Sequence, residues 1–221
     1  MSALEARSTR RLIPRAAFLL AMIAGCAHTP MDRCRGGSAD DCDAIGRAAL
    51  EHADAGAAAD AFALGCTAGR AADCWEAGRL EADPFRALQL YERACPQIRS
   101  ACNSLGLLLV RGPGAHDPQR AQSLFRDACE EIPEACNNLG MVLLDAPTPI
   151  VRDAIQAALL FQQACDRGAA QGCMNVGLML SRGDGLKQDL PRARAILRKA
   201  CAAGSYGACQ EMQRIGPKSK H

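Results

Sequence analysis

The sequence predicts an all-α solenoid in which helix-turn-helix units stack in a row and each unit is stapled by a disulfide. Twelve of the thirteen cysteines form six pairs of nearly constant spacing, and the first cysteine of each pair recurs after 29 to 36 residues. Periods of about 20–50 residues are typical of repeat arrays, whose units bury their apolar faces only against one another. Aromatic residues make up 4% of the chain, so we expect a core of small aliphatic side chains that needs reinforcement. The pairs are Cys34 with Cys42, Cys66 with Cys74, Cys95 with Cys102, Cys129 with Cys136, Cys165 with Cys173 and Cys201 with Cys209.

A first helix is predicted to end at the first cysteine of each pair. Eight positions before that cysteine the residue is Ala in five units, and four positions before it the residue is large and apolar. These offsets place one apolar stripe on a helix. Asp83-Pro84, Asp117-Pro118 and Asp189 mark helix starts, because Asp caps a helix and Pro suits its first turn. The large apolar residues are Phe62, Tyr91, Phe125, Phe161 and Leu197.

A second helix is predicted to begin near the second cysteine of each pair. Glycine stands four positions beyond that cysteine in five units, at Gly46, Gly78, Gly106, Gly140 and Gly177. Glycine inside a helix costs about 0.5–1 kcal/mol relative to Ala, so we expect the backbone of a neighbouring helix to approach closely there. The sixth unit has Gln213 instead, as expected for a terminal unit with a polar outer face.

The spacing within the cysteine pairs favours disulfides over a metal. Each pair encloses six or seven residues, and none of the four histidines lies inside a pair. Zinc ligands are usually separated by two to four residues and commonly include His. Disulfides persist outside the cytoplasm; in a reducing compartment the same cysteines would be reduced and buried. We therefore expect six local disulfides, with no metal and no cofactor.

The N-terminal segment is typical of an export signal. Arginines precede an apolar run at residues 16–24, which is far shorter than the roughly 20 residues that span a bilayer; a short buried helix is the alternative. Ile23-Ala24-Gly25-Cys26 resembles the lipobox of bacterial lipoproteins, which implies cleavage of residues 1–25 and lipidation of Cys26, with several acyl chains giving a stable anchor. The resemblance implies a lipid-anchored protein of the bacterial cell envelope. Because no acidic residue directly follows Cys26, it also implies the outer membrane, facing the periplasm.

The repeat pattern resembles the Sel-one-like repeats, relatives of the tetratricopeptide repeat, and within them the cysteine-rich Hcp group. Leu178–Leu186 with Asp189 matches the inter-helix turn of that family. The resemblance covers residues 34–213 and implies a right-handed α/α superhelix of about five repeats plus a capping half-repeat. Residues 26–33 would then be a short tether and residues 214–221 a polar tail.

The charge balance argues against nucleic-acid binding. Beyond residue 25 the chain has 22 Lys and Arg against 23 Asp and Glu, whereas phosphate neutralisation needs an excess of clustered cations. The expected partners are envelope proteins or peptides, or a peptidoglycan-related ligand.

Two functions remain open. Stacked helix pairs give a concave surface suited to extended ligands, and the second helices carry asparagines whose amides could bind a peptide backbone or could satisfy free N–H groups of the first helical turn. The candidate peptide-binding residues are Trp75, Asn103, Asn137, Asn138 and Asn175. Alternatively, the Hcp resemblance implies a β-lactamase or penicillin-binding protein. No Ser-x-x-Lys, Gly-x-Ser-x-Gly, His-Glu-x-x-His or P-loop motif is present, so no catalytic residue is predicted.

Overall fold

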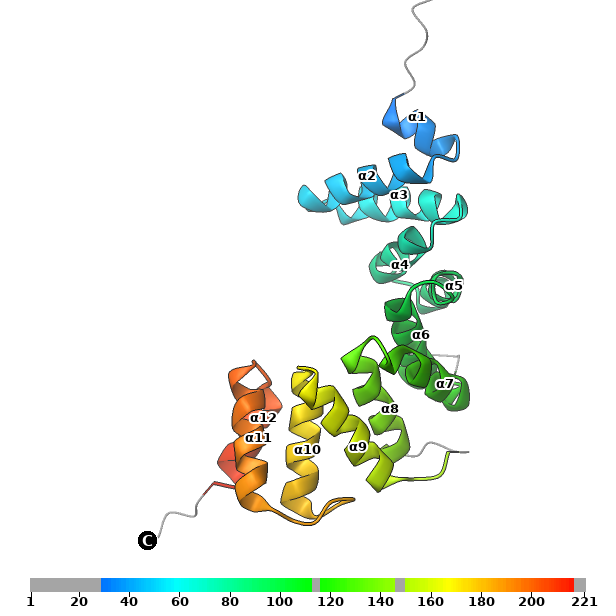
Figure 1. Ribbon diagram of the computed structural model, residues 1–221. Helices are drawn as coiled ribbons and strands as arrows, with labels where there is room; N and C mark the ends of the chain where they lie inside the picture. The colour runs from blue at the N-terminus through cyan, green and yellow to red at the C-terminus, as the bar shows by residue number, and fades with distance from the viewer. Residues whose placement is uncertain (1–28, 113–115, 146–149, 217–221) are drawn as a thin grey trace, which may run out of the picture.

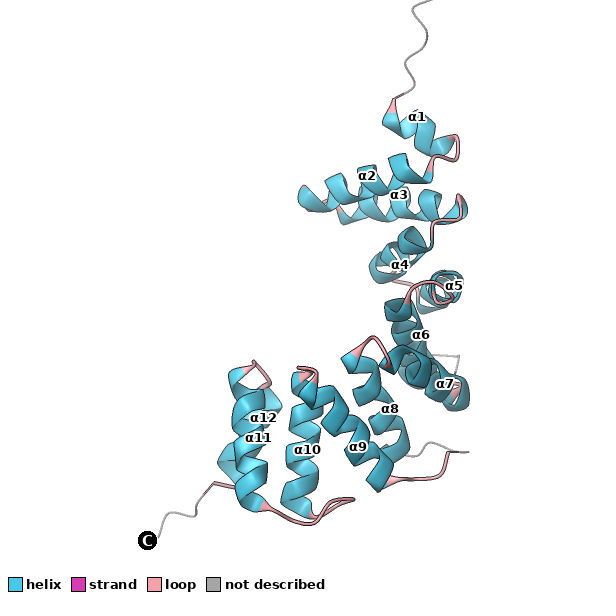
Figure 2. Cartoon of the chain, in the orientation of Figure 1, coloured by secondary structure: helices cyan, strands magenta, loops and turns pink. Residues whose placement is uncertain are grey.

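The computed structural model describes residues 29–112, 116–145 and 150–216, and within these ranges helices alternate with short turns (Figure 2). The helices follow one another along a curved rod (Figure 1). Their bounds are α1 Pro30–Arg35, α2 Ala39–Glu51, α3 Ala55–Thr67, α4 Ala71–Leu80, α5 Pro84–Ala94, α6 Arg99–Arg111, α7 Pro118–Cys129, α8 Pro133–Asp145, α9 Ala154–Asp166, α10 Ala170–Arg182, α11 Leu190–Ala202 and α12 Tyr206–Arg214. The predicted all-α solenoid of helix-turn-helix units is confirmed.

The predicted helix starts are also confirmed. The Asp83 carboxylate accepts a hydrogen bond from the Phe85 N–H at 2.9 Å, and Asp117 and Asp189 cap α7 and α11 in the same way. At the N-terminus helix begins earlier than expected. Thr29 and Asp32 form a reciprocal capping box at the start of α1, so residues assigned to the tether are helical from Pro30.

Each unit consists of an odd-numbered and an even-numbered helix joined by one disulfide. The Cα–Cα distances of the six bridges are 4.4 to 4.8 Å, and their sequence separations are seven or eight residues. These distances lie within the range that a disulfide requires. No bridge in the described chain joins one unit to the next, so neighbouring units are held together by packing and by hydrogen bonds between units. The bridges are those of the predicted pairs, and they join Cys34 to Cys42, Cys66 to Cys74, Cys95 to Cys102, Cys129 to Cys136, Cys165 to Cys173 and Cys201 to Cys209.

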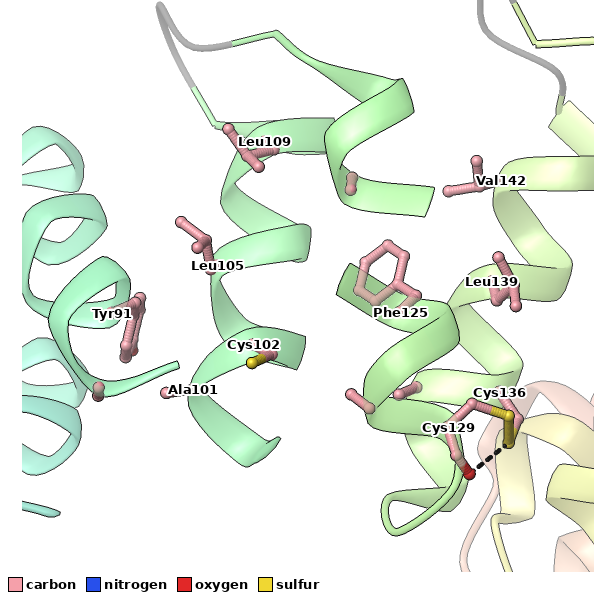
Figure 3. Packing of buried hydrophobic residues seen from close by; sticks show 14 of the residues in the cluster. Tyr91, Ala101, Cys102, Leu105, Leu109, Phe125, Cys129, Cys136, Leu139 and Val142 are labelled. Carbon is pink, nitrogen blue, oxygen red and sulfur yellow. Dashed lines mark hydrogen bonds between the residues drawn. A yellow bond between two sulfur atoms is a disulfide. The ribbon is translucent and has the colours of Figure 1, made fainter. Parts of the chain in front are cut away.

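The packing between units rests on a ring-into-glycine contact. A Cβ added to Gly106 would lie 2.6 Å from the Phe125 ring, and one added to Gly140 would lie 2.7 Å from the Phe161 ring. Gly46, Gly78 and Gly177 receive Phe62, Tyr91 and Leu197 in the same manner. The expectation that a helix backbone approaches these glycines was wrong, because the neighbour is the large apolar side chain of the following odd-numbered helix. Figure 3 shows Phe125 in the core with Leu105, Leu139 and Val142.

The even-numbered helices lie on the inner side of the curve. α8 contacts both α6 and α10, and α10 also contacts α12. Neighbouring odd-numbered helices from α5 onward make fewer such contacts, so their outer faces diverge. The inner face of the solenoid is therefore lined by α6, α8 and α10.

Candidate functional site

Three adjoining hollows form one groove on the inner face. The first, about 210 Å³, lies between α6, α7 and α8; the second, about 330 Å³, lies over α8 and α10; and a small third hollow of about 60 Å³ continues along α10. The first two share Arg111, Asn138 and Met141, and the last two share Asn175. We call this continuous feature the inner groove.

Asparagines of successive units are paired along the inner groove. Asn138 Nδ2 donates to Asn103 Oδ1 at 2.8 Å, and Asn175 Nδ2 donates to Asn137 Oδ1 at 2.8 Å. These four residues are all the asparagines of the chain. Their side chains bond one another rather than first-turn N–H groups, so the helix-capping alternative was wrong. The regular stacking of units brings together residues about 35 positions apart, and we call the paired residues the asparagine ladder.

Each ladder pair retains hydrogen-bonding capacity. An Asn side chain has two donor hydrogens on nitrogen and two lone pairs on oxygen. The bond within a pair leaves Nδ2 of one residue and Oδ1 of the other without a partner among the described residues, and none of these atoms is fully buried. Asn137 and Asn175 are themselves 9% exposed, so they belong to the floor of the groove and not to its rim.

Charged and sulfur-containing side chains line the walls of the inner groove. Arg111 is exposed and has no carboxylate partner in the described chain, and His116 and Asp145 line the same hollow. Met141 and Met174 lie beside the ladder. Methionine side chains are unbranched and adapt to irregular ligands, so the groove combines fixed amides with adaptable apolar walls.

Trp75 lies apart from the inner groove. It stands on α4 at the position that Asn103 and Asn137 occupy in later units, packs against the core and lies beneath the Arg79 guanidinium at 5.2 Å. It lines none of the three hollows. The prediction that it belongs with the asparagines as a binding residue stays untested, but the structure does not bring it to them.

A second polar cluster, which the sequence reasoning missed, lies between the first two units. Asp73 on α4 is fully buried, and neither of its carboxylate oxygens has a hydrogen-bond partner among the described residues. Its nearest cation is Arg70, with Nε 3.4 Å from Oδ1. Burial, and then the negative charge of Asp43, raise the pKa of the Asp73 carboxyl to about 7. The cluster of Asp43, Arg70 and Asp73 is therefore an internal ionisable site.

A signal for this cluster was present in the sequence. The position before the second cysteine holds Ala or Gly in the last four units but Asp73 in the second. The facing position before the first cysteine holds Gly65 where the later units have Ala. A Cβ on Gly65 would overlap Asp73 Oδ2, so the missing side chain at position 65 makes room for the larger Asp73 side chain.

No metal site or spanning helix is found in the described ranges. Groups of three His, Cys, Asp or Glu side chains placed to hold a metal are absent from residues 29–112, 116–145 and 150–216. None of the helices in these ranges is both long and apolar enough to traverse a bilayer. Cys26, the predicted lipidation site, lies outside the described residues.

The fold and the inner groove define an α/α repeat protein with a grooved inner face. The Sel1 repeat model matches residues 68–95, 99–131, 133–168 and 170–205, which is more than half of the chain. The chain therefore belongs to the Sel1 repeat family, as the sequence resemblance predicted.

Two of the solved structures to which the chain is similar share its fold. A Sel1 repeat protein from Oxalobacter formigenes is 17% identical over 85% of this chain and 78% of that one, with a TM-score of 0.74. A protective antigen of uropathogenic Escherichia coli with an SLR fold is 20% identical over 84% of this chain and 43% of that one, with a TM-score of 0.72. Helicobacter pylori cysteine-rich protein B is 27% identical over 58% of this chain and 94% of that one, with a TM-score of 0.48. No curated protein matches the chain.

Proposed function

We propose that this protein is a lipid-anchored scaffold of the bacterial cell envelope that binds an extended peptide segment of another envelope protein in the inner groove. The asparagine ladder carries the proposal. Asn137, Asn138 and Asn175 line the groove, where the Asn137 Nδ2 donor and the Asn138 and Asn175 Oδ1 acceptors have capacity left. A peptide backbone presents alternating acceptors and donors. The Sel1 repeat assignment supports a protein-binding role, since stacked helix pairs form extended concave surfaces.

The anchor is proposed from the sequence alone. The lipobox resemblance, the short apolar run before it and the odd thirteenth cysteine support lipidation at Cys26. Metabolic labelling with a palmitate analogue is expected to mark the wild type and not Cys26→Ser. Labelling that persists in Cys26→Ser would contradict this anchor.

Peptide binding is tested on the ladder itself. Envelope extracts passed over the tethered protein supply a candidate partner, and a labelled peptide from that partner is then titrated by fluorescence anisotropy. Removing one ladder pair with Asn103→Ala and Asn138→Ala is expected to weaken binding about 5- to 150-fold, because each lost hydrogen bond contributes about 0.5–1.5 kcal/mol.

The matched control is another amide. Gln163 is exposed on the outer face of α9, and Gln163→Ala is expected to leave the affinity unchanged. Thermal melting of all variants separates binding from stability. If the ladder variants melt at lower temperature but bind the peptide as the wild type does, the ladder is structural and the binding proposal is wrong.

A further inference from the structure

The contact between the first and second units places two carboxyl groups against each other. Asp43 lies on α2 of the first unit and the fully buried Asp73 on α4 of the second, and their side chains are within hydrogen-bonding reach of each other. Two ionised carboxylates are both acceptors, so a hydrogen bond between them forms only when one of them holds a proton. A single proton therefore joins the two units at this point, and we call Asp43 and Asp73 the carboxyl pair.

The charges around the carboxyl pair balance only when that proton is present. Two guanidinium groups meet three carboxylates there. The contacts are Arg70 with Asp40 at 2.5 Å, Arg70 with Asp43 at 3.3 Å, Arg70 with Asp73 at 3.4 Å and Arg47 with Asp43 at 2.9 Å. Glu76, which also faces Arg47, is paired with Arg79 at 2.7 Å, and from α3 the pair is faced by Gly65. Without the proton, the cluster has one uncompensated negative charge beside a buried carboxylate, which is costly.

The turn that connects the first unit to the second is strained at one residue. Ala53, between α2 and α3, has a φ of 58°, and it is the one non-glycine residue of the described chain with a positive φ. A residue with a Cβ is unfavourable in this left-handed conformation. The turn at Ala53 is therefore the expected hinge for movement of the first unit.

The apolar packing at this contact is the smallest along the array. Its buried cluster consists of Ala58, Phe62 and Ala77, whereas the two other clusters of the described chain are much larger. The nearest disulfides, Cys34–Cys42 and Cys66–Cys74, each lie within one unit and do not cross the contact. Segments held by few buried apolar contacts open at the lowest free-energy cost, so the first unit is the part of the array that one buried charge can release.

We propose that the carboxyl pair is a pH-sensitive switch that holds the first unit against the second when it is protonated and releases α1 and α2 when the proton is lost. Burial and the charge of Asp43 raise the pKa of Asp73 from 3.8 to about 7, so the closed contact binds the proton more tightly than the open one. Opening therefore becomes about tenfold more favourable per pH unit between about pH 4 and pH 7 and levels off above that range. The switch does not rest on the peptide-binding groove, which lies on α6, α8 and α10.

Hydrogen exchange of the full chain, followed by mass spectrometry at about pH 5, 6, 7 and 8, tests the switch. Protection is expressed relative to the intrinsic exchange rate at each pH. A short helix that has left its neighbours is only marginally stable, so release exposes the amides of α2. We expect the protection of α2 to fall about tenfold per pH unit up to about pH 7, while the protection of α8, inside the array, stays constant.

Two substitutions remove the proton dependence in different ways. Asp73→Asn is neutral at every pH, whereas Asp43→Asn removes the repelling charge and supplies an N–H donor to the ionised Asp73. Each is expected to keep α2 protected at about pH 8, and each tests the switch without the other. The matched control is Asp60→Asn, at an exposed carboxylate on α3, which should keep the pH dependence of the wild type.

Three outcomes overturn the proposal. The first is a wild-type α2 whose protection does not change with pH, and the second is the same pH dependence in Asp73→Asn as in the wild type. The third is an equal loss of protection in α2 and α8, because the whole chain and not the contact between the first two units would then respond to the proton.

Discussion

Replacing Gly65 and Asp73 together with Ala is expected to stabilise the protein, although Gly65→Ala alone destabilises it. A Cβ at position 65 overlaps the Asp73 carboxylate, and overpacking of this kind costs about 1–3 kcal/mol. With Asp73→Ala in place the overlap disappears, and Ala in the helix interior gains about 0.5–1 kcal/mol over Gly. The double variant reproduces the pairing of Ala94 with Ala101 in the next unit. The coupling between the two changes is therefore about 2–4 kcal/mol in favour of the double variant.

The benefit of Asp73→Ala is expected to grow with pH. The folded-state pKa of Asp73 is raised from 3.8 to about 7 by burial and by Asp43, so the folded protein keeps a proton that the unfolded chain releases. Between about pH 4 and pH 7 this group makes the wild type less stable as pH rises. At one pKa unit per 1.36 kcal/mol, the loss at pH 8 is about 2–4 kcal/mol. The small cavity left in Asp73→Ala costs about 1 kcal/mol, which reduces the net gain in stability by that amount.

Urea denaturation followed by circular dichroism measures these effects at about pH 4.5, 6 and 8. The difference in unfolding free energy between Asp73→Ala and the wild type should increase across this series, while other carboxylates cancel in the difference. The reasoning is refuted if that difference does not change with pH. It is also refuted if Gly65→Ala lowers stability equally with and without Asp73.

Three further predictions follow from the packing and the site. Gly140→Ala should lower stability by about 1–3 kcal/mol, because the new Cβ would lie 2.7 Å from the Phe161 ring. The control Gly56→Ala, whose new Cβ meets only an ordinary contact at 3.6 Å, should be neutral or stabilising. Urea denaturation measures both, and equal effects would contradict the ring-into-glycine model. Cys129→Ala with Cys136→Ala should cost about 2–4 kcal/mol, and non-reducing peptide mapping of the wild type should recover this pair and not one that joins two units. The purified protein should not hydrolyse nitrocefin above background, since no activated nucleophile is apparent in the described residues; turnover that one point mutation abolishes would favour the β-lactamase alternative.

The sequence predicted the elements better than it predicted their contacts. The periodic cysteines, the Asp83 and Asp117 caps and the apolar position four before each cysteine are local signals, and each reported an element correctly. The expected partner of the recurring glycine was wrong. A glycine that recurs at one position of a helix predicts that another group approaches closely there, but it does not identify that group. Gly106 meets the Phe125 ring, a contact between units that depends on how the helices cross.

The site shows the same division. The asparagines were recognised as a group, yet their bonds run from one unit to the next, between Asn103 and Asn138 and between Asn137 and Asn175. Those partners are set by the rise of the solenoid and not by neighbours in the chain. The buried Asp73 could not be predicted from the sequence, because its relation to Gly65 is apparent only when the two positions are known to face each other.

The disulfide arrangement has a consequence for how the chain acquires its bridges. Each bridge joins a cysteine to the next one along the chain, seven or eight residues later, from Cys34 with Cys42 to Cys201 with Cys209. If the chain is exported and Cys26 is lipidated as proposed, an oxidant that couples the remaining thiols in their order of emergence would generate the native set directly. No rearrangement of mismatched bridges, a process that takes minutes to hours when uncatalysed, would be required. Loss or duplication of a whole unit would leave the bridges of all remaining units intact, so the array can change length without leaving a repeat cysteine unpaired.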